Sequence, residues 1–109
     1  MIVVVEGKND YNKIKSVFSN ANVLITNGSA VDLEFIEMLK SLSFHHEIIL
    51  CLDPDYAGER IRKIISNAIP SAKHIYAQVN DAISKNGKKI GIEHMSNKKI
   101  IDMFSNIKT

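Results

Sequence analysis

The chain has 109 residues, 45% of them hydrophobic, which is enough for one compact domain with a core of its own. A single cysteine excludes a disulfide framework, and no apolar stretch is long enough to span a membrane. With no basic leader either, we expect a reducing, cytoplasmic setting. Residues 1–84 carry 8 basic against 10 acidic residues, whereas residues 85–109 carry 6 against 2. The basic end is typical either of phosphate contacts or of a solvated lysine-rich surface.

Four short apolar runs of strand length alternate with segments of helical periodicity. The runs cover residues 2–5, 23–25, 48–52 and about 74–78. Between and after them, apolar side chains recur three and four residues apart, as on the buried face of a helix. These positions are Tyr11, Ile14, Val17 and Phe18; Phe35, Met38, Leu39 and Leu42; Ile61, Ile64, Ile65, Ala68 and Ile69; and Ile100, Ile101, Phe104 and Ile107. The pattern predicts one α/β domain over residues 1–109, with about four mainly parallel strands and helices on both faces.

Several residues predict where these elements begin and end. Ser29 and Asp32 resemble a capping box at the start of the second helix, and Ser96 resembles the N-cap of the last one. Pro70 closes the third helix. The stretch 79–95 shows no clean period, and a loop of that length in a compact domain is usually functional or mobile.

Three carboxylates directly follow two of the expected strands. Glu6 comes after residues 2–5, and Asp53 and Asp55 come after residues 48–52. The carboxyl ends of neighbouring parallel strands meet at one edge of a sheet, so we expect these side chains to lie close together. Carboxylates at close range repel, and a cation such as Mg²⁺, which prefers oxygen ligands, would relieve this. The plainer alternative is that Asp53 caps a helix and Glu6 sits in a turn.

Basic and polar residues near these acids are candidates for binding phosphate. Gly58 opens the third helix, so its first N–H groups would be free for an anion. Lys8 and Arg60 lie near the acids along the chain and could contact phosphates. Asn27 and Ser29 end the second strand, where they either touch substrate or form a turn and cap. The full set of candidate RNA- or phosphate-binding residues is Lys8, Asn27, Ser29, Gly58, Arg60, Lys88 and Lys89.

Other charged and reactive residues have plainer interpretations. Arg62 is either a phosphate contact or a solvated charge on a helix face. His45 and His46 lie at the opposite end of the third strand from the acids, so we expect them at the surface. His74 begins a strand and is expected to be structural, and Cys51 is expected to be a small buried hydrophobe.

Two of these motifs resemble a known family. Residues 5–8 (Val-Glu-Gly-Lys) and 53–60 (Asp-Pro-Asp-Tyr-Ala-Gly-Glu-Arg) resemble the Toprim domain of topoisomerases, primases and some nucleases. The similarity to one branch, the ribonuclease M-five family, covers further segments in order: residues 26–30, 53–64, 70–74 and 91–94. The resemblance implies an endoribonuclease that depends on Mg²⁺ (or Mn²⁺) and cleaves precursor 5S ribosomal RNA held by the 5S-binding large-subunit ribosomal protein. We expect the protein to be a monomer. The resemblance also implies a further C-terminal RNA-binding region, without which the domain is expected to be weakly active.

The resemblance also implies roles for individual acids. Glu6 would be a metal ligand or the general acid/base, and Asp53 and Asp55 would be metal ligands. Ala57 stands where topoisomerase-type sites usually have a further acid. Glu93 is interpreted either as the replacement for that acid or as a surface glutamate.

Two alternative functions stay open at this point. One is a small stand-alone Toprim protein that acts on DNA or another nucleic acid. The other is a non-catalytic regulatory α/β domain that binds Mg²⁺, which a paired Asp-Pro-Asp with a partner glutamate fits less well. Neither the number of metal ions nor the carboxylate that transfers protons follows from the pattern.

Overall fold

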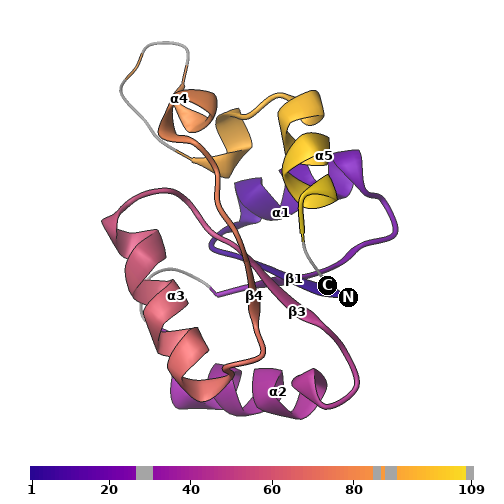
Figure 1. The fold of residues 1–109 in the computed structure, drawn as a ribbon, viewed down its shortest axis with the longest axis vertical. Helices are drawn as coiled ribbons and strands as arrows, with labels where there is room; N and C mark the ends of the chain where they lie inside the picture. The colour runs from indigo at the N-terminus through magenta and orange to yellow at the C-terminus, as the bar shows by residue number, and fades with distance from the viewer. Residues whose placement is uncertain (27–30, 85–86, 88–90, 108–109) are drawn as a thin grey trace.

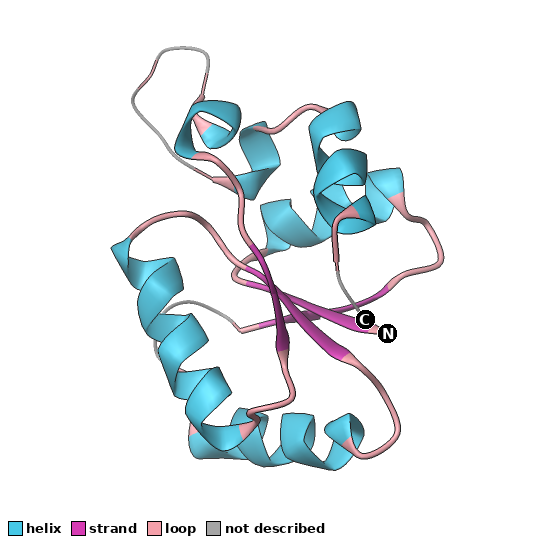
Figure 2. Cartoon of the chain, viewed as in Figure 1, coloured by secondary structure: helices cyan, strands magenta, loops and turns pink. Residues whose placement is uncertain are grey.

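The structure is a computed structural model, described for residues 1–26, 31–84, 87 and 91–107. Its centre is a four-stranded sheet with helices on both faces (Figures 1 and 2). The strands are β1 (Ile2–Val5), β2 (Asn22–Ile25), β3 (Ile48–Cys51) and β4 (Lys73–Ile75). They lie in the order β2-β1-β3-β4, and every neighbouring pair is parallel. The predicted α/β fold with parallel strands is confirmed.

Helices cover both faces of this sheet. They are α1 (Lys8–Val17), α2 (Leu33–Ser43), α3 (Tyr56–Ala68), α4 (Val79–Ala82), the 3-10 helix η1 (Ile92–His94) and α5 (Asn97–Ser105). Figure 1 shows α2 and α3 against one face of the sheet, and α1 and α5 on the other. None of the helices described is both long and apolar enough to cross a membrane.

The two central strands supply both layers of the core. Successive side chains in a strand point to opposite faces, so Val4 and Leu50 pack with α2 and α3. Val3, Val5 and Cys51 pack with α1 and α5. All residues of β1 and β3 are buried, as expected for strands covered on both sides.

The register of the sheet brings the ends of β1 and β3 together. Val4 pairs with Leu50, and on the other side of β3 Cys51 pairs with Ile75 of β4. The loops that leave β1, β3 and β4 therefore start at the same edge of the sheet, which we call the carboxyl edge.

Strand β4 and helix α2 have other boundaries than the sequence predicted. Strand β4 covers Lys73–Ile75, so it begins earlier and is shorter than expected, although the apolar character of the chain continues beyond it. Helix α2 begins at Leu33, with Asp32 as the N-cap accepting a hydrogen bond from the Phe35 N–H at 2.8 Å. The predicted capping box therefore placed the start of the helix too far toward the N-terminus. Its first residue, Ser29, lies outside the described residues.

The stretch 79–95, which was predicted to be a loop, contains two short elements. Helix α4 has four residues and η1 has three, too few for either to show a period in the sequence. The predicted N-cap Ser96 is confirmed, because its side chain accepts a hydrogen bond from the Lys99 N–H at 3.2 Å.

Candidate active site

Glu6 and Asp53, from loops 47 residues apart in sequence, are joined at the carboxyl edge. The Asp53 backbone N–H donates to Glu6 Oε1 at 2.9 Å. Gly58 allows this approach, because a Cβ there would lie 2.0 Å from the Asp53 carbonyl oxygen and 3.1 Å from Glu6 Oε1. The structure therefore brings together the two acids that the strand pattern placed at one edge.

Asp55 is the N-cap of helix α3. Its Oδ1 accepts a hydrogen bond from the Gly58 N–H at 2.7 Å. The prediction that this N–H is free for an anion is therefore wrong, and the helix begins at Tyr56, two residues before Gly58. The negative charge of Asp55 still reaches the other acids, since it raises the pKa values of Glu6 and Asp53.

Asp10 is a further acid at this site that the sequence interpretation missed. It lies in the first turn of α1, is only 8% exposed, and its Oδ2 accepts a hydrogen bond from the Gly7 N–H at 3.2 Å. Burial raises its pKa to about 7, and the charges of Asp53 and Glu93 act in the same direction. The available sequence signal was its place three residues after the helix N-cap, where a side chain can reach back to the cap.

Glu93 reaches the site from the far part of the chain. The 3-10 helix η1 that carries it lies against the acids, and the neighbouring Ile92 N–H donates to Asp53 Oδ1 at 2.7 Å. The Glu93 backbone N–H is also a hydrogen-bond donor to Asp10, which lowers the pKa of that carboxyl. Its side chain lies 3.3 Å from His94 Nε2. We call Glu6, Asp10, Asp53, Asp55 and Glu93 the acidic cluster.

The electrostatics of the acidic cluster are those of crowded, partly buried carboxylates. Burial raises the pKa of Glu6 to about 7, and the charges of Asp53, Asp55 and Asp10 add to the effect. Burial also raises the pKa of Asp53. Among the described residues, none of Glu6, Asp10 and Asp53 forms an ion pair with a basic side chain. A bound cation would lower the cost of keeping these groups charged.

The donor atoms of the acidic cluster suit a hard divalent cation such as Mg²⁺. All of them are carboxylate oxygens. The hydrogen bonds with the distances given above are accepted by one named oxygen of each carboxylate: Glu6 Oε1, Asp10 Oδ2, Asp53 Oδ1 and Asp55 Oδ1. Within the described part of the chain, no three His, Cys, Asp or Glu side chains are placed to enclose an ion. Mg²⁺ usually binds through one or two carboxylates and keeps several waters, so an open site of this kind fits it.

The candidate phosphate-binding residues divide into three groups. Lys8 and Arg60 are exposed near the N-terminal ends of α1 and α3, at the same edge of the sheet as the acidic cluster. Gly58 packs against the loop of Asp53, as given above. Asn27, Ser29, Lys88 and Lys89 lie outside the described residues.

Arg62 is not a solvated helix charge but a buried brace at the carboxyl edge. It is 4% exposed, and its guanidinium donates to the carbonyl oxygens of Leu50 at 3.4 Å, Leu52 at 3.5 Å and Ile75. Its Nε lies 3.4 Å from Glu59 Oε1 but makes no hydrogen bond, so the ion pair is loose. We call Arg62 with these three carbonyl groups the Arg62 brace, because it ties β4 to β3.

Apart from His94, the histidines lie away from the acidic cluster, whereas the cysteine is buried next to it. His45 and His46 are exposed before β3, at the opposite edge of the sheet, as predicted. Cys51 is fully buried in β3, which raises the pKa of its thiol to about 12 and makes it unreactive.

Comparisons with known proteins agree with this geometry. A model of the Toprim domain matches residues 1–94. Proteins named Ribonuclease M5 (ribonuclease M-five) are similar over nearly the whole chain: that of Bacillus cereus is 44% identical and that of Bacillus subtilis 39% identical, each over 97% of this chain. The chain spans only 56% of the length of either relative.

A solved structure is also similar. It is described as a small TOPRIM domain protein from Bacillus stearothermophilus, with a TM-score of 0.73 over 98% of this chain and 86% of that one. The sequences are 19% identical, so this similarity shows the fold alone.

Proposed function

The chain belongs to the Toprim domain family, and on this premise we propose that it is the catalytic domain of an endoribonuclease that cleaves precursor 5S ribosomal RNA. The proposal is supported by 44% identity to a ribonuclease M5 over 97% of the chain. The observation that carries it is the acidic cluster, which gathers five carboxylates at the carboxyl edge: those of the loops after β1 and β3, of the first turn of α1 and of η1.

The proposed cofactor is Mg²⁺ or Mn²⁺, because Toprim nucleases generally use divalent metal ions and the donor set is all oxygen. One or two of the carboxylates of Glu6, Asp53, Asp55 and Glu93 would hold the ion together with several waters, and Asp10 would lie beside them. A bound ion supplies a Lewis acid for the phosphodiester and a source of hydroxide near neutral pH.

The protein's own groups hold the carboxylates in position and exchange protons. Burial raises the pKa of Glu6 to about 7 in the metal-free chain, as it does that of Asp10, and we propose that Glu6 is the group that exchanges a proton at neutral pH. Its Oε1 is held by the Asp53 N–H, so Glu6 stays in place, and Oε2 would be the oxygen that exchanges the proton. The Ile92 N–H holds Asp53 in the same way.

The proposed substrate and partners follow the relatives. Precursor 5S ribosomal RNA would be presented by the 5S-binding large-subunit ribosomal protein, in the cytoplasm, to a monomer of this protein. Lys8 and Arg60 are the described basic residues that we propose contact its phosphates. Asn27, Ser29, Lys88 and Lys89 stay predictions for the same role.

The test is cleavage of precursor 5S ribosomal RNA in the presence of the ribosomal protein and Mg²⁺. Because the chain spans 56% of its relative, we would assay both the chain and a chimera with the remaining part of the Bacillus cereus protein. Asp53→Asn is expected to abolish defined cleavage. Glu37→Gln, an exposed acid on α2, is the matched control and should leave it unchanged. Cleavage that survives Asp53→Asn, or no cleavage by the chimera, would refute the proposal.

A second candidate function is a stand-alone Toprim protein that acts on another nucleic acid. The observation that favours it is the small TOPRIM domain protein of Bacillus stearothermophilus, of which this chain covers 86%. Asp53-dependent cleavage of DNA or unrelated RNA by the chain alone, with precursor 5S ribosomal RNA left intact by the chimera, would support it.

A further inference from the structure

The peptide group between Leu52 and Asp53 is held on both sides. Its carbonyl oxygen accepts a hydrogen bond from Arg62 Nη2 at 3.5 Å, and its N–H, which belongs to Asp53, donates to Glu6 Oε1 at 2.9 Å. The peptide is trans and planar, so its C=O and N–H point in opposite directions. Arg62 and Glu6 therefore bind opposite sides of one rigid unit.

This peptide group leads directly into the acidic cluster. Leu52 follows β3 and is 1% exposed, and the next residue, Asp53, carries the carboxylate that accepts from the Ile92 N–H at 2.7 Å. The Asp53 carbonyl oxygen accepts in turn from the Asp55 N–H at 2.9 Å. Rotation of the peptide plane would take the Asp53 N–H away from Glu6 and move the Asp53 side chain. The orientation of this peptide therefore sets how two acids of the cluster lie relative to each other.

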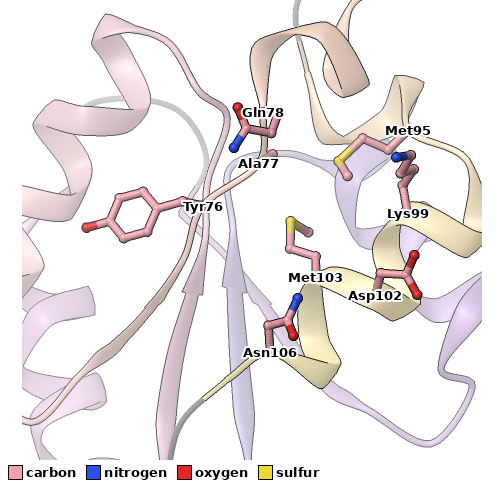
Figure 3. A pocket seen from close by; sticks show the side chains of 8 residues that line it. All are labelled: Tyr76, Ala77, Gln78, Met95, Lys99, Asp102, Met103 and Asn106. Atoms are coloured by element: carbon pink, nitrogen blue, oxygen red, sulfur yellow. The ribbon is translucent and has the colours of Figure 1, made fainter.

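Arg62 is suited to orient the peptide because its own side chain is fixed. Its Nη1 lies 3.1 Å from His74 Nδ1, and the His74 Nε2 lies 3.0 Å from Ser66 Oγ. The Arg62 guanidinium carbon lies 4.3 Å from the centroid of the Tyr76 ring. Figure 3 shows this ring pointing away from the neighbouring cavity of about 230 Å³, which is lined by residues after β4 and by α5. The ring thus covers the guanidinium instead of filling the cavity.

Burial makes the effect of Arg62 on the peptide stronger. Arg62 is 4% exposed, and in a setting of low dielectric a cation acts on a carbonyl dipole even at 3.5 Å. Linked hydrogen bonds polarise one another, so donation to the Leu52 carbonyl makes the Asp53 N–H a better donor to Glu6. Burial lowers the pKa of Arg62, and the charge of Glu6 is among those that oppose this, so the two groups attract each other across the peptide.

We propose that Arg62 is a positioning residue of the site: it holds the Leu52–Asp53 peptide so that the Asp53 N–H points at Glu6, and thereby keeps both acids in place for a cation. The last step rests on the proposed function, whereas the orientation of the peptide does not. Groups behind the ligands of a metal site often act in this way, and their loss typically costs about 10- to 100-fold in metal affinity or activity.

The sequence allows this one peptide group to be observed by NMR. Leu52-Asp53 is the only Leu-Asp pair in the chain, so labelling Leu with ¹³C at the carbonyl and Asp with ¹⁵N gives a single HNCO signal. Hydrogen bonds deshield both the carbonyl carbon and the amide proton. In metal-free Arg62→Met, both signals should move upfield, because the carbonyl loses its donor and the N–H becomes a weaker donor.

Two control variants separate this effect from lost stability and lost charge. Ile65→Ala removes a fully buried side chain from the same helix, so it destabilises the fold but keeps the donor. Lys63→Met removes an exposed positive charge one residue away. Both should keep the two signals at their parent positions, and thermal unfolding shows that each variant is folded. If Arg62→Met does not fold, Tyr76→Ala takes its place: it uncovers the guanidinium, weakens its donation and should move both signals upfield.

The second measurement is a titration of the same signal with Mg²⁺. Arg62→Met should raise the Kd for Mg²⁺ about 10- to 100-fold, while Ile65→Ala and Lys63→Met should match the parent chain. The inference is overturned if the signals of Arg62→Met, or of Tyr76→Ala in its place, stay where they are in the parent. Movement as large in Ile65→Ala, or an unchanged Kd, would overturn it too. If the parent chain itself does not bind Mg²⁺, the proposed metal site fails, while the metal-free spectra still decide whether Arg62 orients the peptide.

Discussion

The carboxyl edge of the sheet holds two partly buried charged regions, the acidic cluster and the Arg62 brace, and they differ in how the charge is compensated. Arg62 meets three backbone carbonyl groups and an aromatic ring. The acids meet backbone N–H groups but also one another, and the pKa values of Glu6 and Asp10 rise to about 7.

This difference distinguishes a charge with a structural role, Arg62, from charges that a bound ligand would compensate, the acidic cluster. A buried charge costs the fold little when most of its hydrogen bonds are made within the chain, and for Arg62 all but that of Nε are candidates for this. Like charges that raise one another's pKa values make the fold less stable, and such arrangements cluster at functional sites. The comparison predicts opposite outcomes when each region is changed.

The largest effect is expected on cleavage, from a change that removes charge and keeps shape. Glu6→Gln retains an oxygen to accept the Asp53 N–H but cannot exchange a proton. It should lower the rate of Asp53-dependent cleavage by about 10²- to 10⁴-fold, the usual contribution of a general acid or base. Single-turnover cleavage kinetics measure it, with Glu37→Gln as the control. A loss of only a few-fold would show that Glu6 does not act in proton transfer.

The next largest effect is expected on stability, from the Arg62 brace. Arg62→Ala leaves the carbonyl groups of Leu50, Leu52 and Ile75 without their shared donor, and should lower the free energy of unfolding by about 3 kcal/mol. Urea unfolding measures this. Arg62→Lys should not restore it, because one ammonium group cannot reproduce the planar fork. Full stability in either variant would contradict the structural role.

A smaller effect, opposite in sign, is expected from the acidic cluster in the metal-free chain. The pKa values of Glu6 and Asp10 rise from 4.5 and 3.8 to about 7, so over that range the folded chain holds protons that the unfolded chain has released. The stability contributed by these two groups is therefore present below about pH 4 and is lost as the pH rises through about 7. The unfolding temperature in EDTA should fall between these limits.

The double variant Glu6→Gln, Asp10→Asn isolates this effect from the titration of the histidines. Its unfolding temperature should depend less on pH than that of the parent chain, and at about pH 8 it should be the more stable of the two. An equal pH dependence in both proteins would show that folding does not raise the pKa values of these two carboxyl groups.

The sequence allowed the sheet and the main acids of the site to be predicted, because buried parallel strands are continuous apolar runs. Residues 2–5 and 48–52 are of this kind, and the topology of such strands places Glu6 and Asp53 at one edge. The prediction of β4 was less accurate because β-favouring residues continue to Tyr76, beyond the last pairing at Ile75.

Asp10 and Arg62 could not be identified from the pattern, for a common reason. An acid in the first turn of a helix and a basic residue on a charged helix face are both ordinary at the surface. What makes them unusual is burial by elements distant in sequence: η1 packs over Asp10, and Arg62 reaches the carbonyl groups of β3 and the end of β4. Such contacts depend on the tertiary fold and produce no periodic pattern in the neighbouring sequence.

The measurement that tests the central claim most directly is stabilisation of the chain by Mg²⁺ at about pH 8, where the acids of the cluster are charged. With metal well above its Kd, the unfolding temperature of the parent chain should rise by about 5 °C or more. Asp53→Asn should lose most of that rise, while Glu37→Gln should keep it. An equal rise in the Asp53 variant, or none in the parent chain, would contradict the assignment of the acidic cluster as a divalent-metal site.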